Sequence, residues 1–236
     1  MIDKHLTDLG DFQTGQVILF DKPLEWTSFN IVKKTRNLIR KKYSYKKIKV
    51  GHAGTLDPLA TGLLIVCTGK FTKQIEKYQA QEKEYIATLR LGQTTPSFDL
   101  ETEVDKEFPI NHITENLFKE ALKKFIGEQK QIPPNFSAKF VDGKRAYVKA
   151  RNGEDFEIRP NNVNISEIEI TDFSLPTVKI RISCSKGTYI RALARDIGEA
   201  LQSGAHLTGL RRTKIGEFNV DDAISIVEFE DLIKKA

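Results

Sequence analysis

The segment from Gly51 to Gly62, GHAGTLDPLATG, combines a carboxylate with an unusual density of glycine. Its one acid, Asp57, precedes Pro58, and a following proline disfavours the α conformation at the aspartate. One interpretation is structural, because Asp is a favoured helix N-cap and Pro suits the first helical position. The other is chemical, because glycines let a ligand approach closely and the carboxylate could then act as a nucleophile. The spacing leaves both interpretations open.

Other common reaction centres have little support in this sequence. The stretch 62–71, GLLIVCTGKF, has six residues between its glycines where a phosphate loop has four, and Phe71 replaces the Ser or Thr that would bind magnesium. The four histidines are scattered without HExxH spacing, the two cysteines are far apart, and there is no GxSxG elbow. We therefore expect no metal site.

Positive charge is gathered in two parts of the chain, although the net charge is only +5. Residues 33–49 hold nine Lys and Arg and no acid, and residues 139–151 hold five bases and one acid, together with Phe140 and Tyr147. The last twenty residues hold six acids and two lysines. Such basic runs can be merely solvated, but two runs with interleaved aromatic residues favour an RNA partner.

The apolar residues indicate strands and helices without a strict βαβ rhythm. Apolar runs predict strands at 16–21, 63–67, 84–91 and 178–184, of which 63–67 (LLIVC) is expected to be buried on both faces. Helical spacing predicts helices at 29–42, at 114–126 with Ile126 on the buried face and a stop at Gly127, and between an N-cap at Thr188 and a stop at Gly204.

These elements predict an α+β fold with a mixed, mainly antiparallel sheet flanked by helices. Residues 131–160 stay polar and basic, and Pro133 and Pro134 exclude a central strand, so we expect a protruding basic insertion there within a single domain spanning residues 1–236. The absence of a long apolar run and of a signal-peptide core near the N-terminus favours a cytoplasmic protein, with Cys67 and Cys184 as buried thiols.

GHAGTLDPLATGLL resembles the signature of the TruB family, the pseudouridine synthases that modify the T-loop uridine of tRNA. The resemblance extends from about residue 15 to 216, and collinear motifs are more specific than any single one. The other segments that resemble family motifs are KP at 22–23 with TS at 27–28, KEYIATLRLGQTT at 83–95, PPNFSAK at 133–139, KARNG at 149–153, CSKGTYIRALARDIG at 184–198 and LRRTKIG at 210–216.

The resemblance implies an enzyme that flips a T-loop uridine of tRNA out of its stack and isomerises it to pseudouridine. Asp57 matches the family's nucleophile, Tyr85 the tyrosine that stacks on the target base, and Arg191 the arginine that pairs with the nucleophile. The reaction breaks the N–C glycosidic bond, turns the uracil and joins C5 to the sugar. It involves no redox change or group transfer, so no cofactor is implied. Attack at the sugar C1′ and attack at the base both remain open.

Further positions match residues that support the site or contact RNA. His52 matches a residue that lies against the displaced T-loop nucleotides, and Leu210 matches an apolar wall of the base pocket. Asp99 and Arg151 match members of a charge network with Arg191. Independently of the resemblance, Arg191 is expected in the first turn of a helix, where the helix dipole disfavours a cation, so we expect it to have an anionic partner. The bases of the 33–49 run and of the insertion are expected to hold the tRNA phosphates. In the insertion these are Lys139, Lys144, Arg145 and Lys149.

Two features depart from the family pattern. The first motif reads KPLEWTS, with Glu25 and Trp26 where a glycine is usual. Only 20 residues follow Gly216, so we expect a short form without the C-terminal RNA-binding domain, acting as a monomer without an obligate protein partner. The alternatives are an RNA-binding module or tRNA chaperone without catalysis, and a glycosyl hydrolase in which Asp99 or Glu84 serves as the second carboxylate beside Asp57.

Overall fold

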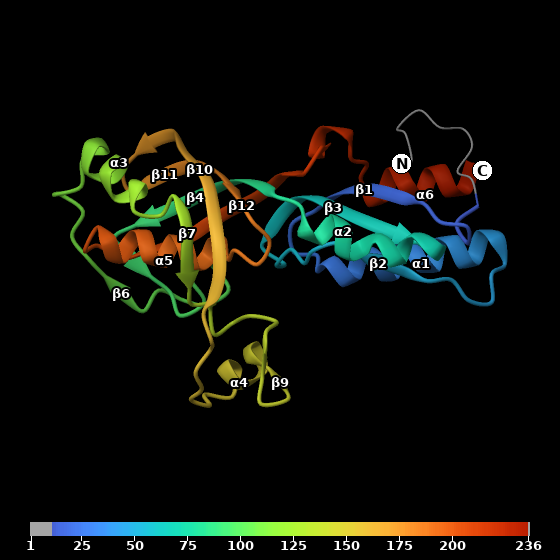
Figure 1. Ribbon diagram of the computed structural model, residues 1–236, viewed down its shortest axis with the longest axis horizontal. Helices are drawn as coiled ribbons and strands as arrows, with labels where there is room; N and C mark the ends of the chain where they lie inside the picture. The colour runs from blue at the N-terminus through green and yellow to red at the C-terminus, as the bar shows by residue number, and fades with distance from the viewer. Residues whose placement is uncertain (1–10, 236) are drawn as a thin grey trace. The chain divides into compact units, whose positions relative to one another are not determined.

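The computed structural model describes residues 11–235, and their contacts divide the chain into two compact units (Figure 1). The first unit comprises the residues up to Tyr85 and those from Leu210 onward, and the second runs from Ile86 to Gly209. Two strands, β4 (Lys83–Leu91) and β12 (Ala205–Ile215), contribute residues to both units. Two observations of the sequence analysis concern residues outside the described range. They are His5, one of the four scattered histidines, and most of the N-terminal segment that lacks a signal-peptide core.

The first unit is built on strands in the order β1-β3-β12-β4. Strand β3 (Ala60–Thr68) pairs antiparallel with β1 (Val17–Lys22) and, near its end, with β2 (Val50–His52). It pairs parallel with β12, with Leu210 beside Ala60. The unit's other elements are α1 (Ser28–Tyr43), the 3₁₀ helix η1 (Gly69–Gln74), α2 (Ile75–Ala80), β13 (Phe218–Asn219), the 3₁₀ helix η2 (Val220–Asp222) and α6 (Ile226–Lys235).

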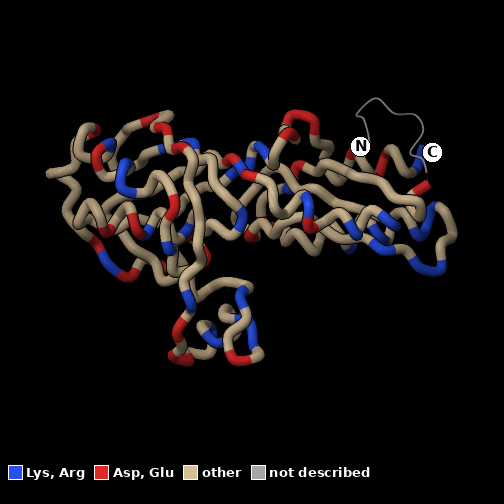
Figure 2. Tube along the Cα trace, viewed as in Figure 1, with Lys and Arg blue, Asp and Glu red and all other residues tan. Residues whose placement is uncertain are grey.

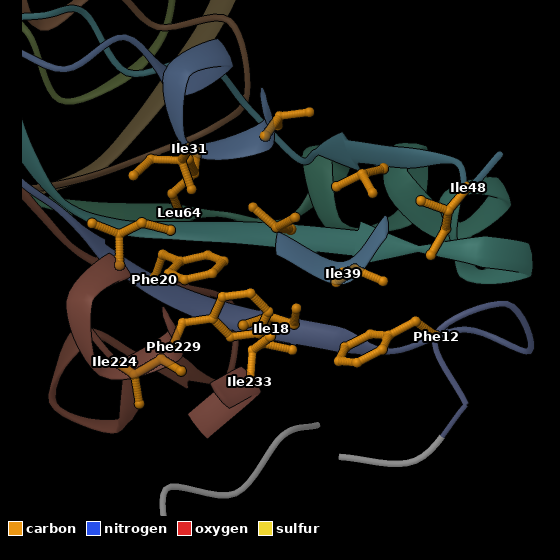
Figure 3. Close-up of a cluster of buried hydrophobic side chains, with 14 residues drawn as sticks. Phe12, Ile18, Phe20, Ile31, Ile39, Ile48, Leu64, Ile224, Phe229 and Ile233 are labelled. Carbon is orange, nitrogen blue, oxygen red and sulfur yellow. The ribbon is translucent and has the colours of Figure 1, made fainter. Parts of the chain in front are cut away.

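Strand β3 is buried on both faces, as its unbroken apolar run predicted. Leu64 faces a cluster that includes Phe20 of β1, Ile31 of α1 and Phe229 of α6 (Figure 3). Its neighbour Leu63 points to the other face, in a second cluster that contains residues of β1, β12 and β13. Successive side chains of β3 thus point alternately into two hydrophobic cores. Burial on both faces holds the strand in place, including its start, where the segment 51–62 ends.

The second unit contains an antiparallel hairpin, β10 (Asn161–Ser174) and β11 (Thr177–Cys184), in the strand order β12-β4-β11-β10-β7. The insertion leaves the sheet at the end of β7 (Gly127–Gln131) and returns at the start of β10 (Figure 1). The fold is therefore the predicted mixed, mainly antiparallel sheet flanked by helices. The unit's other elements are β5 (Gln93–Thr94), β6 (Lys106–Glu107), α3 (Glu115–Lys123), β8 (Phe140–Val141), β9 (Lys144–Arg145), α4 (Ala146–Arg151) and α5 (Ile190–Ala200).

Three helix boundaries differ from the prediction, and one of them is the end of α5, which falls at Ala200 rather than at the expected stop, Gly204. Helix α3 ends at Lys123 rather than Ile126, whose side chain is 50% exposed, because the chain closes a tight last turn before Gly127 (φ 101°) starts β7. Thr188 does not cap α5, since its hydroxyl donates backward to the Ser185 carbonyl at 3.0 Å and the N-cap is Tyr189. Within residues 11–235, no helix combines the length and apolar character needed to cross a membrane.

Candidate active site

Asp57 lies on a turn between β2 and β3, and its side chain is half-buried. The backbone N–H of Ala60, the first residue of β3, donates to the Asp57 carbonyl at 3.1 Å. No helix begins between Asp57 and Ala60, where β3 starts, so the interpretation of Asp57 as a helix cap is wrong. The turn places a half-buried carboxylate three residues before the first residue of the buried strand β3.

A buried lysine supports this turn from one side. Lys22, which has no exposed surface, donates from Nζ to the carbonyls of Pro23 at 2.8 Å, Trp26 at 2.6 Å and Pro58 at 3.4 Å. Burial lowers its pKa to about 8, and the charge of Asp57 opposes that shift. The segment that begins at Lys22 and the segment 51–62 therefore meet at Pro58, the residue after the candidate nucleophile.

A buried arginine supports the same segment from the other side. Arg212 is 1% exposed and donates from Nε to the Leu63 carbonyl at 2.7 Å and from Nη2 to the Gly54 carbonyl at 3.1 Å. Gly62 (φ 102°) accommodates the strand that carries this arginine, because a β carbon there would lie 2.2 Å from the Arg212 carbonyl oxygen. The glycine at this position thus serves close backbone packing.

The start of α1 is tied to the same turn. The Ser28 hydroxyl accepts from the Leu56 N–H at 2.8 Å and donates to the Leu56 carbonyl at 3.1 Å. Glu25, which replaces the family's usual glycine, adopts φ 65° and donates its N–H to the Pro58 carbonyl at 2.8 Å. The chain therefore forms a turn here with a residue other than glycine at positive φ.

The other predicted residues of the first unit lie on strands. His52 of β2 is half-buried, and its pKa is lowered by burial and then by the charge of Arg212, which favours a neutral ring at pH 7. Tyr85 of β4 is 9% exposed. Leu210 is level with Ala60, which is three residues from Asp57 in the sequence. Glu84, beside Tyr85 in the strand, accepts from the Thr213 hydroxyl at 2.7 Å.

In the second unit, Arg191 and Asp99 come together. Arg191 is the second residue of α5 and is 4% exposed. Its Nε lies 3.5 Å from Asp99 Oδ2, and its two terminal nitrogens donate to the carbonyls of Ser97 at 3.2 Å and Phe136 at 2.9 Å. Asp99 is 6% exposed and provides an anion beside a cation that the helix dipole disfavours.

Glu101, which the sequence analysis missed, links Arg151 to this pair. Arg151 forms an ion pair with the Glu101 carboxylate, and the Glu101 N–H donates to Asp99 Oδ1 at 3.0 Å. Arg151 lies at the end of α4, so the chain of contacts runs from the insertion to the start of α5. The sequence offered no signal for Glu101 beyond its place two residues after Asp99.

The four predicted phosphate-binding bases of the insertion divide into two pairs. Lys149 is 9% exposed and pairs with Asp142 at 2.8 Å, and Lys139 donates to Asn161 Oδ1 at 2.7 Å, so both brace the insertion itself. Lys144 and Arg145 are exposed on β9. Among residues 11–235, no group of three His, Cys, Asp or Glu side chains is arranged to hold a metal ion.

Comparison with known proteins connects these features to one family. The model of the N-terminal domain of TruB family pseudouridylate synthases matches residues 40–190, and that of the C-terminal domain of tRNA pseudouridylate synthase B matches residues 191–236. The chain is 61% identical over 221 residues to a tRNA pseudouridine synthase B of Phocaeicola vulgatus, covering 94% of each chain. It is 58% identical over 225 residues to one of Parabacteroides distasonis, covering 95% of this chain and 96% of the relative.

A solved structure supports the same assignment. A crystal structure of a Cbf5-Nop10-Gar1 complex includes a chain with 30% sequence identity and a TM-score of 0.69, and the match covers 93% of this chain and 54% of that one. The chain described here therefore belongs to the TruB family of pseudouridylate synthases and is an enzyme that isomerises uridine to pseudouridine in tRNA.

Proposed function

We propose that the substrate is a uridine in the T loop of tRNA and that Asp57 is the nucleophile. The observation that carries this proposal is the support of the Asp57 turn by two buried cations, Lys22 and Arg212, which hold neighbouring carbonyls. A carboxylate held on a fixed backbone can be aimed at a reacting bond without reorganisation during the reaction.

The chemistry that this site must perform is an isomerisation. The bond between uracil N1 and the sugar C1′ breaks, the ring turns, C5 bonds to C1′, and C5 gives up its proton while N1 gains one. Attack by the carboxylate at C1′ and attack at the base both require Asp57 beside the glycosidic bond. In this proposal Tyr85 stacks on the uracil and can take the C5 proton, and Arg191 supplies the cation that pairs with the nucleophile.

The target base must first leave the folded T arm, which costs a few kcal/mol in lost stacking. We assign this grip on RNA to the exposed bases Lys144 and Arg145, with Lys139 and Lys149 keeping the insertion in shape. His52 and Leu210 border the flipped nucleotide, and the Asp99–Glu101–Arg151 contacts connect the insertion to Arg191. The enzyme acts as a cytoplasmic monomer without cofactor, metal or obligate protein partner. Cys67 and Cys184 are buried and are not joined in a disulfide, which fits a reducing compartment.

The test uses an unmodified tRNA transcript with tritium at uracil C5, in EDTA and without added cofactor. Asp57→Asn should abolish tritium release while filter binding persists, because the amide keeps the shape but not the nucleophile. Glu84→Gln is the matched control, because this carboxylate is already engaged by Thr213 and should not take part in the reaction. Binding by the wild-type protein without release would contradict the proposal and leave an RNA-binding protein, and release of free uracil would indicate a hydrolase.

A further inference from the structure

Helix α1 carries basic residues on two flanks that have different surroundings. On the flank toward α6, Lys34 pairs with Glu230 at 2.6 Å, and Lys42 donates to the Lys234 carbonyl at 3.2 Å. Glu230 of the C-terminal helix thus neutralises one base of this flank.

The second flank is a stripe formed by Phe29, Lys33, Arg36 and Arg40. The spacing i, i+4, i+7, i+11 places the four residues within about 60° of each other around the helix. Phe29 is 60% exposed, and Lys33 and Arg40 are also exposed. Arg36 is half-buried and donates one bond, to the Val50 carbonyl at 3.1 Å. None of these three bases has an ion pair with an acid of residues 11–235.

Positive charge continues beyond the end of the helix. Lys46, Lys47 and Lys49 are exposed in the loop between α1 and β2, and Figure 2 shows blue segments along α1 and this loop. A favourable effect on the helix dipole explains bases in the last turn, but it does not explain Lys33 and Arg36 in the middle of the helix. An unneutralised stripe of this kind suits a polyanion.

The stripe begins at the candidate catalytic turn. Ser28, the first residue of α1, holds both backbone groups of Leu56, the residue before Asp57. From Phe29 to Arg40 the helix rises about 16 Å, so an aromatic ring lies at the end near Asp57 and the bases lead away from it. This is the combination by which proteins bind unpaired nucleic acid: a stacking surface followed by a basic track for the backbone.

We propose that the stripe on α1 binds the RNA strand next to the target uridine, with a neighbouring base or sugar on Phe29 and backbone phosphates along Lys33, Arg36 and Arg40. This inference rests on the proposed function, and it adds a substrate-binding surface in the first unit that is separate from the insertion.

The first test reverses charge on the stripe. The double variant Lys33→Glu/Arg40→Glu is compared with Lys73→Glu/Lys77→Glu, which makes the same change in net charge at exposed lysines of η1 and α2. Binding of the tRNA transcript is measured by filter binding between about 50 and 200 mM salt. We expect the stripe variant to bind at least about 10-fold more weakly and to lower the salt slope by about 1.4 to 1.8, for two lost phosphate contacts. Thermal unfolding verifies that both variants are folded.

The second test locates the RNA. Asn37→Cys places a thiol on the exposed side of α1 without removing a base of the stripe, and it can be labelled with iron-EDTA because Cys67 and Cys184 are buried. We expect cleavage of the bound transcript in the T arm near the target uridine from Asn37→Cys, and none there from Lys77→Cys.

Equal binding by the two charge-reversal variants, or no T-arm cleavage from position 37, would overturn the stripe inference. Failure of the proposed function has a different result, since the wild-type protein would then release no tritium from the transcript in the same preparations. A wild-type protein that releases tritium but binds RNA independently of the stripe therefore contradicts this inference alone.

Discussion

At the scale of single residues, Lys22 determines a pH dependence of stability. Its pKa is lowered by burial from 10.5 to about 8. Between these values the folded chain has lost the proton that the unfolded chain still holds, so the contribution of this group to stability rises with pH. We predict that the free energy of unfolding of wild type minus that of Lys22→Met increases from pH 8 to 10.5. Urea unfolding of both proteins at several pH values measures it.

The comparison with Lys22→Met isolates this residue, because other groups that titrate in the same range, such as Cys67, contribute similarly to both proteins. A difference that stays flat or falls with rising pH would show that Lys22 remains protonated in the folded state.

Lys22 and Arg212 also show where sequence reasoning stopped. Both lie in segments that resembled family motifs. Their partners are backbone carbonyls, however, and the sequence does not show which carbonyls a buried cation will bind. Asp57 could be singled out by composition and spacing. The support beneath it could not, because Arg212 and Gly54 are 158 positions apart in the chain.

At the scale of elements, Gly62 allows β3 and β12 to pair closely. We predict that Gly62→Ala lowers the free energy of unfolding by more than Gly153→Ala. Both glycines have positive φ, which costs an L-residue about 1–2 kcal/mol, but a β carbon at Gly153 meets nothing within 4 Å. The clash at Gly62 should add about 1–3 kcal/mol. Urea unfolding measures both variants, and equal losses would mean that the strands separate easily.

The start of α5 depends on a residue from β7. Gln131 is 2% exposed, accepts from the Tyr189 N–H at 2.8 Å and donates to the Tyr189 carbonyl at 3.1 Å. We predict that Gln131→Met costs about 1–3 kcal/mol of stability and also lowers tritium release, since Arg191 follows two residues later. Lys130→Met, at an exposed neighbour on the same strand, should change neither quantity. Unchanged activity in Gln131→Met would show that the contact of Gln131 with Tyr189 is not needed to position Arg191.

This long-range contact helps to explain why the start of α5 was misjudged. The unbroken apolar run predicted β3, and the alternation of apolar and polar residues predicted β11. Both predictions were possible because the burial of a strand is reflected in the types of its own residues. The N-cap of α5 is Tyr189, and the side chain that holds its backbone belongs to Gln131, 58 positions away, whereas local spacing pointed to Thr188. For Asp57 the spacing left a cap role and a chemical role open, and only the start of β3 at Ala60 rules out a helix after it.

At the scale of the whole molecule, each unit has its own buried core, but β4 and β12 run through both. A strand that loses its pairing in one unit loses part of its support in the other, so we expect the chain to unfold as one cooperative system. The sequence contains one tryptophan, Trp26, which packs against the core of the first unit and so reports on that unit alone.

The decisive variant therefore lies in the second unit. Phe118 of α3 is fully buried and contacts Phe173 with ring centroids 5.8 Å apart. Phe118→Ala should cost about 3–5 kcal/mol. We predict that it lowers the urea midpoint of Trp26 fluorescence as much as that of far-UV circular dichroism, although Trp26 lies in the other unit. A fluorescence midpoint that stays at the wild-type value while the dichroism becomes biphasic would show that the shared strands do not couple the two cores.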